Sequence, residues 1–102
     1  MDEVRTEVVI DTSQFRAERF TVQGGRGLPW QRCQISDRVL VVQQGRGYCY
    51  RSHGRDEHRE EVADGDIVHL PHLVWHRIVA APDQALSGTL VTRVPADVEL
   101  RR

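Results

Sequence analysis

The chain has 102 residues, of which 39% are hydrophobic and 28% charged, and its formal net charge is -1. This length predicts one domain, residues 1–102, with a single modest core, and no apolar run approaches the roughly 20 residues that span a bilayer. All fourteen basic residues are Arg and are interspersed with acids, so the concentrated basic surface that nucleic acid requires is missing. We therefore expect neither a membrane protein nor a nucleic-acid-binding protein.

Residues 1–7 are acidic and lack the apolar stretch of a signal peptide, which predicts a cytoplasmic protein. The two cysteines, Cys33 and Cys49, lie in strand-like segments without CxxC spacing. In a reducing compartment these cysteines are not expected to form a disulfide. We expect both to be small buried side chains.

Short apolar runs recur along the chain, each bounded by turn residues, and no segment has a sustained 3.6-residue apolar period. Regularly spaced short strands of this kind predict an all-β sandwich or barrel. The expected strands are residues 6–10, 15–22, 30–35, 38–43, 48–52, 60–63, 67–70, 75–80 and 85–94. Residues 95–102 are polar enough to be either an edge strand or a disordered tail.

Turn chemistry separates these runs. Gly45 and Gly65 supply the positive φ of tight hairpins, and Pro82 suits the start of a turn. His53 and His58 flank a charged stretch, residues 54–57, that is typical of a hairpin loop, so both histidines are expected at the surface.

The run 38–43 has apolar residues on both strand faces, with Leu40 and Val42 on one face and Val39 and Val41 on the other. Such a strand is expected to be covered on both sides. In a small barrel the outer cover would be another sheet or a second subunit, so we predict a homodimer.

Residues 65–76 read as a turn, a short buried strand, a second turn and a strand that carries a histidine. Gly65, Pro71 and His76 have the spacing G-x5-P-x-G-x2-H-x3-N, and this segment resembles the second motif of the cupin superfamily. Leu73 stands where the motif has its second Gly, and Ala80 where it has Asn. The resemblance implies a single small cupin-type β-barrel, that is, a double-stranded β-helix or jelly roll, with its motif-bearing part at about residues 25–92.

The first cupin motif, G-x5-H-x-H-x4-E-x6-G, can be aligned with Gly25 and Gly45 at its ends. Gln31, Cys33 and Arg38 then stand where a metal-bearing cupin has His, His and Glu. An arginine there puts a permanent cation close to where a metal ion would bind, and like charges repel strongly in a low-dielectric interior. We therefore predict no metal cofactor.

Two arrangements of candidate site residues follow. Alternation places Gln31 and Cys33 on the more apolar face of residues 30–35, which is expected to point inward together with Ile35. The first arrangement is a metal-free pocket lined by Gln31, Cys33, Arg38, His69 and His76. The second is a divalent-metal site made of Cys33, His69 and His76, because thiolate and imidazole both suit zinc.

In the metal-free pocket, Arg38 would hold an anionic oxygen and His76, assisted by His69, would move a proton. Tyr48 and Tyr50 share one strand face and are candidates for the pocket wall, with core or interface packing as the alternative. This set predicts a small-molecule enzyme, a cyclase, isomerase or other proton-transfer catalyst of a natural-product pathway, acting on an anionic or enolisable substrate. The alternative is a non-catalytic cupin that binds a small acidic ligand or a sugar.

Overall fold

The structure is a computed structural model that describes residues 4–101; the other residues of the predicted 1–102 domain lie outside the described part. Every element of residues 4–101 is a β-strand, and none is a helix long and apolar enough to cross a membrane. The strands are β1 (Val4–Asp11), β2 (Phe15–Val22), β3 (Gln31–Cys33), β4 (Arg38–Gln44), β5 (Arg46–His53), β6 (Asp56–Ala63), β7 (Ile67–Leu70), β8 (Trp75–Ala80), β9 (Leu86–Arg93) and β10 (Val98–Leu100).

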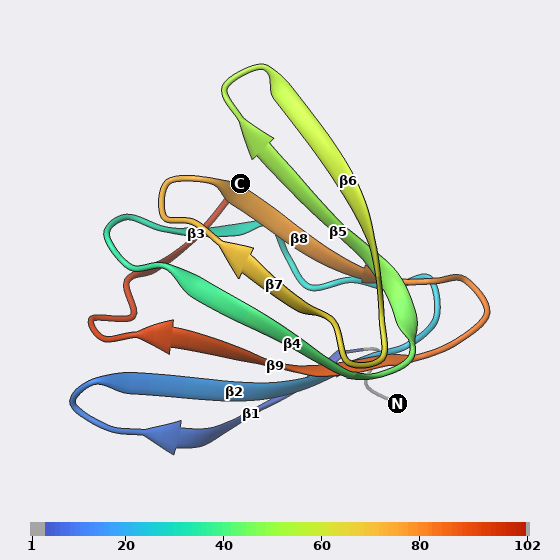
Figure 1. Cartoon of the computed structure of the whole chain (residues 1–102), viewed down its shortest axis with the longest axis horizontal. Helices are drawn as coiled ribbons and strands as arrows, with labels where there is room; N and C mark the ends of the chain where they lie inside the picture. The colour runs from blue at the N-terminus through green and yellow to red at the C-terminus, as the bar shows by residue number, and fades with distance from the viewer. Residues whose placement is uncertain (1–3, 102) are drawn as a thin grey trace.

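The strands form two antiparallel five-stranded sheets. The first sheet has the order β1-β2-β9-β4-β7, and the second has the order β10-β3-β8-β5-β6. The two sheets face each other, converging at the lower right of Figure 1 and separating toward its left side. The predicted all-β, jelly-roll architecture is confirmed.

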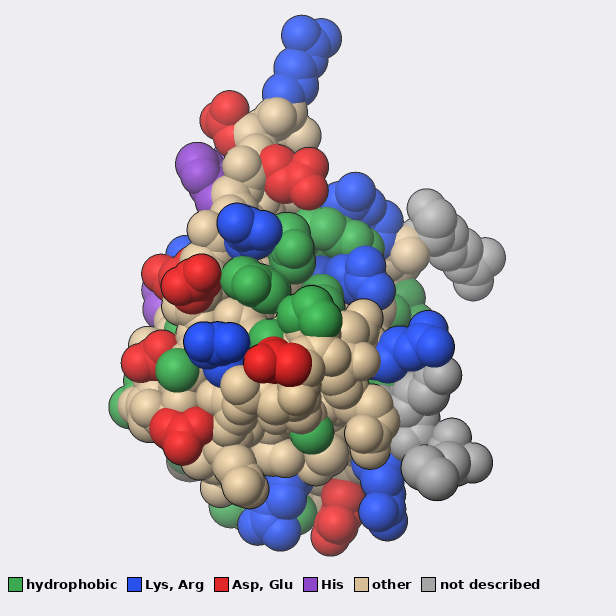
Figure 2. Space-filling model, turned by 90° about the vertical axis from the view of Figure 1, so that its right-hand side faces the viewer, with side chains coloured by type: hydrophobic (Ala, Val, Ile, Leu, Met, Phe, Trp, Pro, Cys, Tyr) green, Lys and Arg blue, Asp and Glu red, His purple; other side chains and the backbone are tan. Residues whose placement is uncertain are grey.

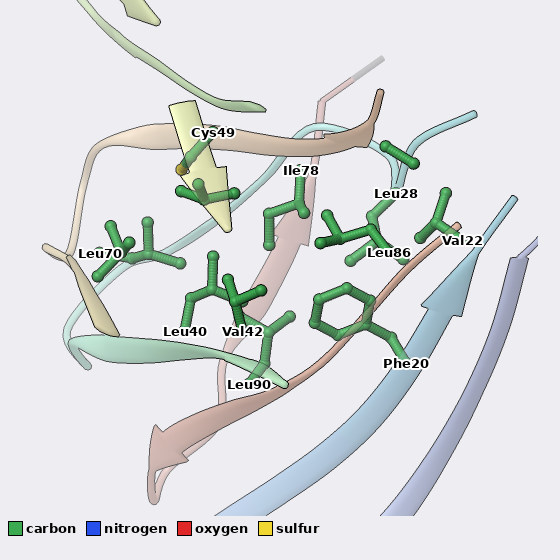
Figure 3. Packing of buried hydrophobic residues seen from close by; sticks show 13 residues of the cluster. Phe20, Val22, Leu28, Leu40, Val42, Cys49, Leu70, Ile78, Leu86 and Leu90 are labelled. Atoms are coloured by element: carbon green, nitrogen blue, oxygen red, sulfur yellow. The ribbon is translucent and has the colours of Figure 1, made fainter. Parts of the chain in front are cut away.

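The core lies between the sheets and is built by strict alternation of side chains. Leu40 and Val42 of β4 point toward Cys49 of β5 and Ile78 of β8 (Figure 3). The cluster of buried residues comprises Phe20, Val22, Leu28, Leu40, Val42, Cys49, Val62, Val68, Leu70, Ile78, Ala80, Leu86 and Leu90. Both cysteines are buried and free, as expected.

The strand predictions are close to the observed bounds, and β2, β7 and β8 agree at both ends. Of the two alternatives for the tail, the edge strand is right, because β10 pairs with β3 at the border of the second sheet. The predicted hairpin loop at residues 54–57 is present but shorter, because the turn comprises residues 54–55 and β6 begins at Asp56. His53 and His58 are exposed, and Figure 2 shows acidic and basic side chains interspersed along the projecting β5–β6 hairpin.

The turn predictions are confirmed at Gly45 and Gly65, whose φ angles are 101° and 84°. Leu73, in the connection between β7 and β8, also has a positive φ of 65°. This is the position where the second cupin motif has its Gly. Leucine pays a steric cost in this left-handed conformation because its Cβ crowds the following carbonyl.

We expected both faces of β4 to be covered. Among the described residues only the inner face is covered. Leu40 and Val42 are buried in the core, whereas Val39 on the outer face is 36% exposed. No second layer of residues 4–101 packs on that outer face, since the chain forms only the two sheets.

Candidate functional site

One end of the barrel interior is polar, although the layer of side chains next to it is apolar. Register pairs place Arg16, Thr92 and Arg38 side by side across β2, β9 and β4 of the first sheet. Opposite them, register pairs place Gln31, His76 and Arg51 side by side across β3, β8 and β5. We call these residues the polar layer: Arg16, Gln31, Arg38, Arg51, His76 and Thr92. Each lies an even number of positions from a core residue of its own strand, as Arg38 does from Leu40 and His76 from Ile78, and therefore points to the same inner face.

Arg38 is the centre of the polar layer. Arg38 is only 2% exposed, which confirms that its side chain points inward. Its Nε donates to Thr92 Oγ1 at 2.9 Å, and its Nη1 donates to Gln31 Oε1 at 2.9 Å and approaches His76 Nε2 at 3.2 Å. All three partners are neutral, and none of these hydrogen bonds uses Nη2. Among residues 4–101 no carboxylate forms an ion pair with Arg38, although the charge of Glu18, which is paired with Arg16, also acts on Arg38. Burial lowers the pKa of Arg38 from its usual value.

The contact with Arg38 determines the tautomer and the protonation state of His76, which is 3% exposed. A guanidinium has no acceptor, so His76 Nε2 must accept the hydrogen bond from Arg38. The proton of the neutral ring is then on Nδ1, which faces the carbonyl oxygen of Val74 at 3.4 Å. Burial and, next, the charge of Arg38 lower the pKa of His76 to about 4, so the ring is neutral at pH 7.

Two further arginines flank Arg38 and His76, and each has an acidic partner. Arg16 Nε lies 3.6 Å from Glu18 Oε1, and Arg51 Nη2 lies 2.8 Å from Glu60 Oε1. The buried Nε atoms of Arg16 and Arg51 have no hydrogen-bond partner among the described residues. Three guanidinium charges against two carboxylates leave the polar layer and its acids with a net charge of +1.

Cys33 also points inward, on the same face of β3 as Gln31, and it is 1% exposed. Burial raises the pKa of the Cys33 thiol, although the nearby charge of Arg38 opposes this shift. The thiol is therefore uncharged at neutral pH. Ile35, expected on the same face, is 66% exposed because β3 ends at Cys33 and the chain turns away.

His69 is a correction: it does not point into the barrel. Val68 and Leu70 are the buried residues of β7, so His69 lies on the opposite face, with its side chain 61% exposed. His69 Nε2 lies 2.9 Å from Asp37 Oδ2, and the Nδ1 of His72 lies 2.7 Å from Asp37 Oδ1. The predicted catalytic role of His69 beside His76 and the predicted metal site of Cys33, His69 and His76 therefore lose their geometric basis.

Tyr48 and Tyr50 are a second correction, because they do not line the barrel. On β5 the inward residues are Cys49 and Arg51, so both tyrosines lie on the outer face of the second sheet. Tyr48 and Tyr50 have ring centroids 6.4 Å apart, and Trp30 lies at the same distance from Tyr50. These tyrosines belong to an outer aromatic surface, separate from Arg38 and His76.

No protein-family model matches the sequence, and none of the curated proteins compared with it matches either. Solved structures do match. Rru_A2000 from Rhodospirillum rubrum, described as a cupin-2 domain, has a TM-score of 0.82 at 22% identity, over 98% of this chain and 66% of that chain. A Klebsiella pneumoniae protein with a double-stranded β-helix domain has a TM-score of 0.86 at 14% identity, over 98% of this chain and 85% of that one. The chain has the cupin fold.

KdgF from Halomonas sp. is also similar, with a TM-score of 0.74 at 19% identity, over 100% of this chain and 84% of that chain. At these identities the likeness concerns the cupin fold alone. The chain spans slightly less than two thirds of the Rhodospirillum protein, so activities of longer cupins do not carry over with the fold.

The residues at the metal positions of the cupin motifs do not fit a metal ion. Two of these positions, Gln31 and His76, direct their acceptor atoms at the Arg38 guanidinium, which itself stands at the third. A metal ion bound by Gln31 and His76 would lie beside a permanent cation in a buried layer. Among the described residues no group of three His, Cys, Asp or Glu side chains is placed to hold a metal ion.

Sequence reasoning missed Arg16, Arg51 and Thr92. The signal for Thr92 was present, because it continues the alternation of buried residues along β9. Arg51 likewise follows Cys49 on the inner face of β5. Alternation alone does not separate an inward arginine from one that curls back to solvent, so the three-dimensional layer was needed.

Proposed function

We propose that this cupin binds a small anionic molecule in its barrel, with Arg38 as the fixed cation. The observation that carries the proposal is the burial of the Arg38 guanidinium among neutral acceptors, without an ion-paired carboxylate among the described residues. The charge of Glu18 acts on Arg38, but Glu18 forms its ion pair with Arg16. A buried charge without a counter-charge is costly, and a carboxylate or phosphate oxygen at Nη2 would supply one. The net charge of +1 of the polar layer favours a ligand with one negative charge.

Proton-transfer catalysis, as in an isomerase or a cyclase, is the second candidate, and the contact between Arg38 and His76 favours it. If a ligand oxygen takes over the hydrogen bond of Arg38 Nη1, the lone pair of His76 Nε2 becomes available. A neutral imidazole can then accept a proton from a carbon next to a carbonyl, while Arg38 stabilises the enolate oxygen. Natural-product biosynthesis and a cytoplasmic location belong to this proposal.

We further propose that the site works without a metal ion, because Arg38 replaces an acidic ligand. Elemental analysis of protein purified without chelator is expected to find well under one transition-metal ion per chain. About one zinc, iron or nickel per chain, lost in the His76→Ala variant, would require the site to be redrawn.

Binding is tested by titration calorimetry with acetate, pyruvate and inorganic phosphate, and with neutral acetamide. The wild-type protein is expected to bind at least one of the three anions and not acetamide. Arg38→Met should weaken that binding by about 2–5 kcal/mol, as the loss of one member of a buried charge pair does, and should leave the β circular-dichroism signal unchanged. The control is Arg19→Met, which removes an exposed arginine on β2. Equal binding by wild type and Arg38→Met would refute the proposal.

The catalytic candidate needs its own measurement. Incubation with pyruvate in deuterium oxide, followed by proton NMR, reports exchange of the methyl protons that enolisation would allow. His76→Gln keeps an acceptor for Arg38 and should retain binding but lose this exchange. If the wild-type protein binds pyruvate without exchanging its protons, enolisation of this substrate is ruled out, and anion binding remains the function.

A further inference from the structure

The strands β3 and β10 form a two-stranded ribbon that is weakly joined to the rest of the second sheet. β3 pairs with β8 through a single register pair, Gln31 with His76, whereas β5 pairs with β8 along six residues. β10 pairs only with β3 and forms the border of the sheet. We call this ribbon, with Trp30 before it and Arg101 after it, the β3–β10 flap.

The flap is held together internally by polar contacts. The carboxylate of Glu99 on β10 accepts hydrogen bonds from Arg32 Nε at 3.0 Å and from Gln34 Nε2 at 2.6 Å. The Gln34 backbone N–H donates to Asp97 Oδ2 at 3.1 Å. Two strands linked in this way can move as one unit.

Two sets of side-chain contacts hold the flap to the rest of the second sheet. The Trp30 ring lies 6.4 Å from the ring of Tyr50 on β5, and the contacts with β8 centre on Trp75. The Arg32 guanidinium lies 4.7 Å from the Trp75 ring centroid, and that of Arg101 lies 5.7 Å from the same ring and 4.6 Å from Trp30. One backbone hydrogen bond joins the flap to the β7–β8 connection, from Leu73 N to Cys33 O at 2.8 Å. Cation–π contacts near the surface are weak.

A ligand that binds Arg38 has to pass the β3–β10 flap. Arg38 and His76 are 2% and 3% exposed, so neither can be reached without movement. The flap carries Gln31, which bonds Arg38 directly. The chain just before the flap stays fixed to β8, because Leu28 N donates to Ile78 O at 2.9 Å.

We infer that the β3–β10 flap opens as a unit, with the two arginines on Trp75 as its latch, and that this opening admits the anion to Arg38. The admission of the anion rests on the proposed anion-binding function. The opening of the flap can be measured without any ligand. Edge elements with few contacts open locally at lower free energy than the whole protein unfolds. The single Gln31–His76 pair is the attachment that breaks beside the site.

Native-state thiol labelling with Ellman's reagent at pH 8 tests the opening, because the chain has one buried cysteine on the flap and one off it. Cys33 on β3 and Cys49 on β5 are 1% and 0% exposed, so neither reacts in the closed molecule. Cys33 is expected to react faster than Cys49, whose exposure requires the core to unfold. Cys33→Ser and Cys49→Ser variants assign the two rates.

The latch is tested by Arg101→Ala, which should raise the labelling rate of Cys33 about two- to fivefold, the effect of losing a weak cation–π contact, and leave that of Cys49 unchanged. Arg59→Ala is the matched control. The guanidinium of Arg59 lies 4.9 Å from the ring centroid of Tyr48, a contact of the same kind away from the flap. This variant should change neither rate.

Equal rates for Cys33 and Cys49 in the wild-type protein, or a Cys33 rate unaffected by Arg101→Ala, would overturn the inference. Its link to the site is tested by the exchange broadening of the pyruvate methyl signal in NMR. Arg101→Ala should raise the association rate of pyruvate by the same factor as the Cys33 rate, and an unchanged association rate would refute the gate. If no anion binds the wild-type protein, the proposed function fails, while the two cysteine rates still decide whether the flap opens.

Discussion

The charge of Arg38 and the neutrality of His76 depend on each other. His76 offers Nε2 as an acceptor only while its ring is neutral, and Arg38 keeps it neutral by opposing protonation next to a buried cation. A protonated His76 would break this hydrogen bond and put two cations in contact. The pair therefore has one stable protonation state over a wide pH range.

This dependence predicts acid sensitivity of stability. The pKa of His76 is about 4 in the folded chain against 6.5 for an ordinary histidine, so as the pH falls the unfolded chain takes up this proton first. The stabilisation, roughly 3 kcal/mol for a shift of this size, is full above about pH 6.5 and is lost as the pH falls toward 4. Urea denaturation at pH 7, 6 and 5 measures it.

His76→Gln is the control for this prediction, because glutamine accepts from Arg38 and does not titrate. The variant should lose less stability between pH 7 and pH 5 than the wild-type protein does. Parallel losses in the two proteins would show that other groups cause the acid sensitivity.

At the residue scale, sequence reasoning identified Arg38, His76, Gln31 and Cys33 as inward residues, because motif spacing and alternation agreed there. It failed at His69, because the run Ile-Val-His-Leu of β7 has apolar residues on both faces and does not reveal which face is buried. The neutral acceptors around Arg38 were unexpected. The contact with Thr92 crosses from β4 to β9, which no local pattern reports.

The connection between β7 and β8 is an element under local strain. Leu73 has φ of 65°, where glycine is favoured, and it is 45% exposed, so its side chain contributes little burial. Leu73 N nevertheless donates to Cys33 O, so the strained turn is tied to β3.

Leu73→Gly should therefore stabilise the protein by up to about 1 kcal/mol, since relief of the left-handed strain exceeds the greater freedom of glycine in the unfolded chain. Thermal unfolding measures this as a higher Tm. Leu73→Ala keeps the strain and removes the side chain, so it should not stabilise. A lower Tm for the glycine variant would show that the Leu73 side chain matters more than the backbone.

At the element scale, strand positions were predictable because each apolar run is short and ends at Gly, Pro or Asp. The predicted strand bounds were wrong where a strand is polar and resembles a loop. β6 is mostly charged and exposed, so its first half resembles a loop, and it is a strand only because β5 pairs with it along its whole length. β10 is fixed by its pairing with β3, a long-range contact.

At the scale of the whole molecule, the outer face of the first sheet is an uncovered apolar surface. Register pairs align Ile10, Ala17, Val91 and Val39 across β1, β2, β9 and β4. Ala17 is only 4% exposed, and the row ends at His69 on β7, beside which Ile67 is 71% exposed. An apolar stripe of this kind marks an interaction surface. A second copy carries the same stripe, and a two-fold axis would bring the two stripes together.

We therefore expect a homodimer through this face, with a mass near twice 11.7 kDa by sedimentation at micromolar concentration. The double variant Val39→Glu, Ile67→Glu should be monomeric because it places charges in the interface. Ile35→Glu, at an equally exposed residue of the β3–β4 connection, should stay dimeric. A wild-type mass near 11.7 kDa would count directly against the dimer.

The cupin fold itself was predictable, because the spacing of Gly65, Pro71 and His76 and the succession of short strands gave the same architecture. Function was less predictable, because the ligand positions of this chain depart from the cupin motifs. The polar layer around these positions, made of arginines and neutral acceptors from six strands, is a product of tertiary structure.

The most direct test of the central claim is an NMR titration of the arginine Nε–H signals of nitrogen-15-labelled protein with pyruvate, acetate and phosphate. The signal absent from Arg38→Met should exchange slowly with water, because Arg38 is buried, and should shift to saturation with at least one anion. If that signal never moves while those of exposed arginines do, Arg38 is a structural cation and the barrel does not bind anions.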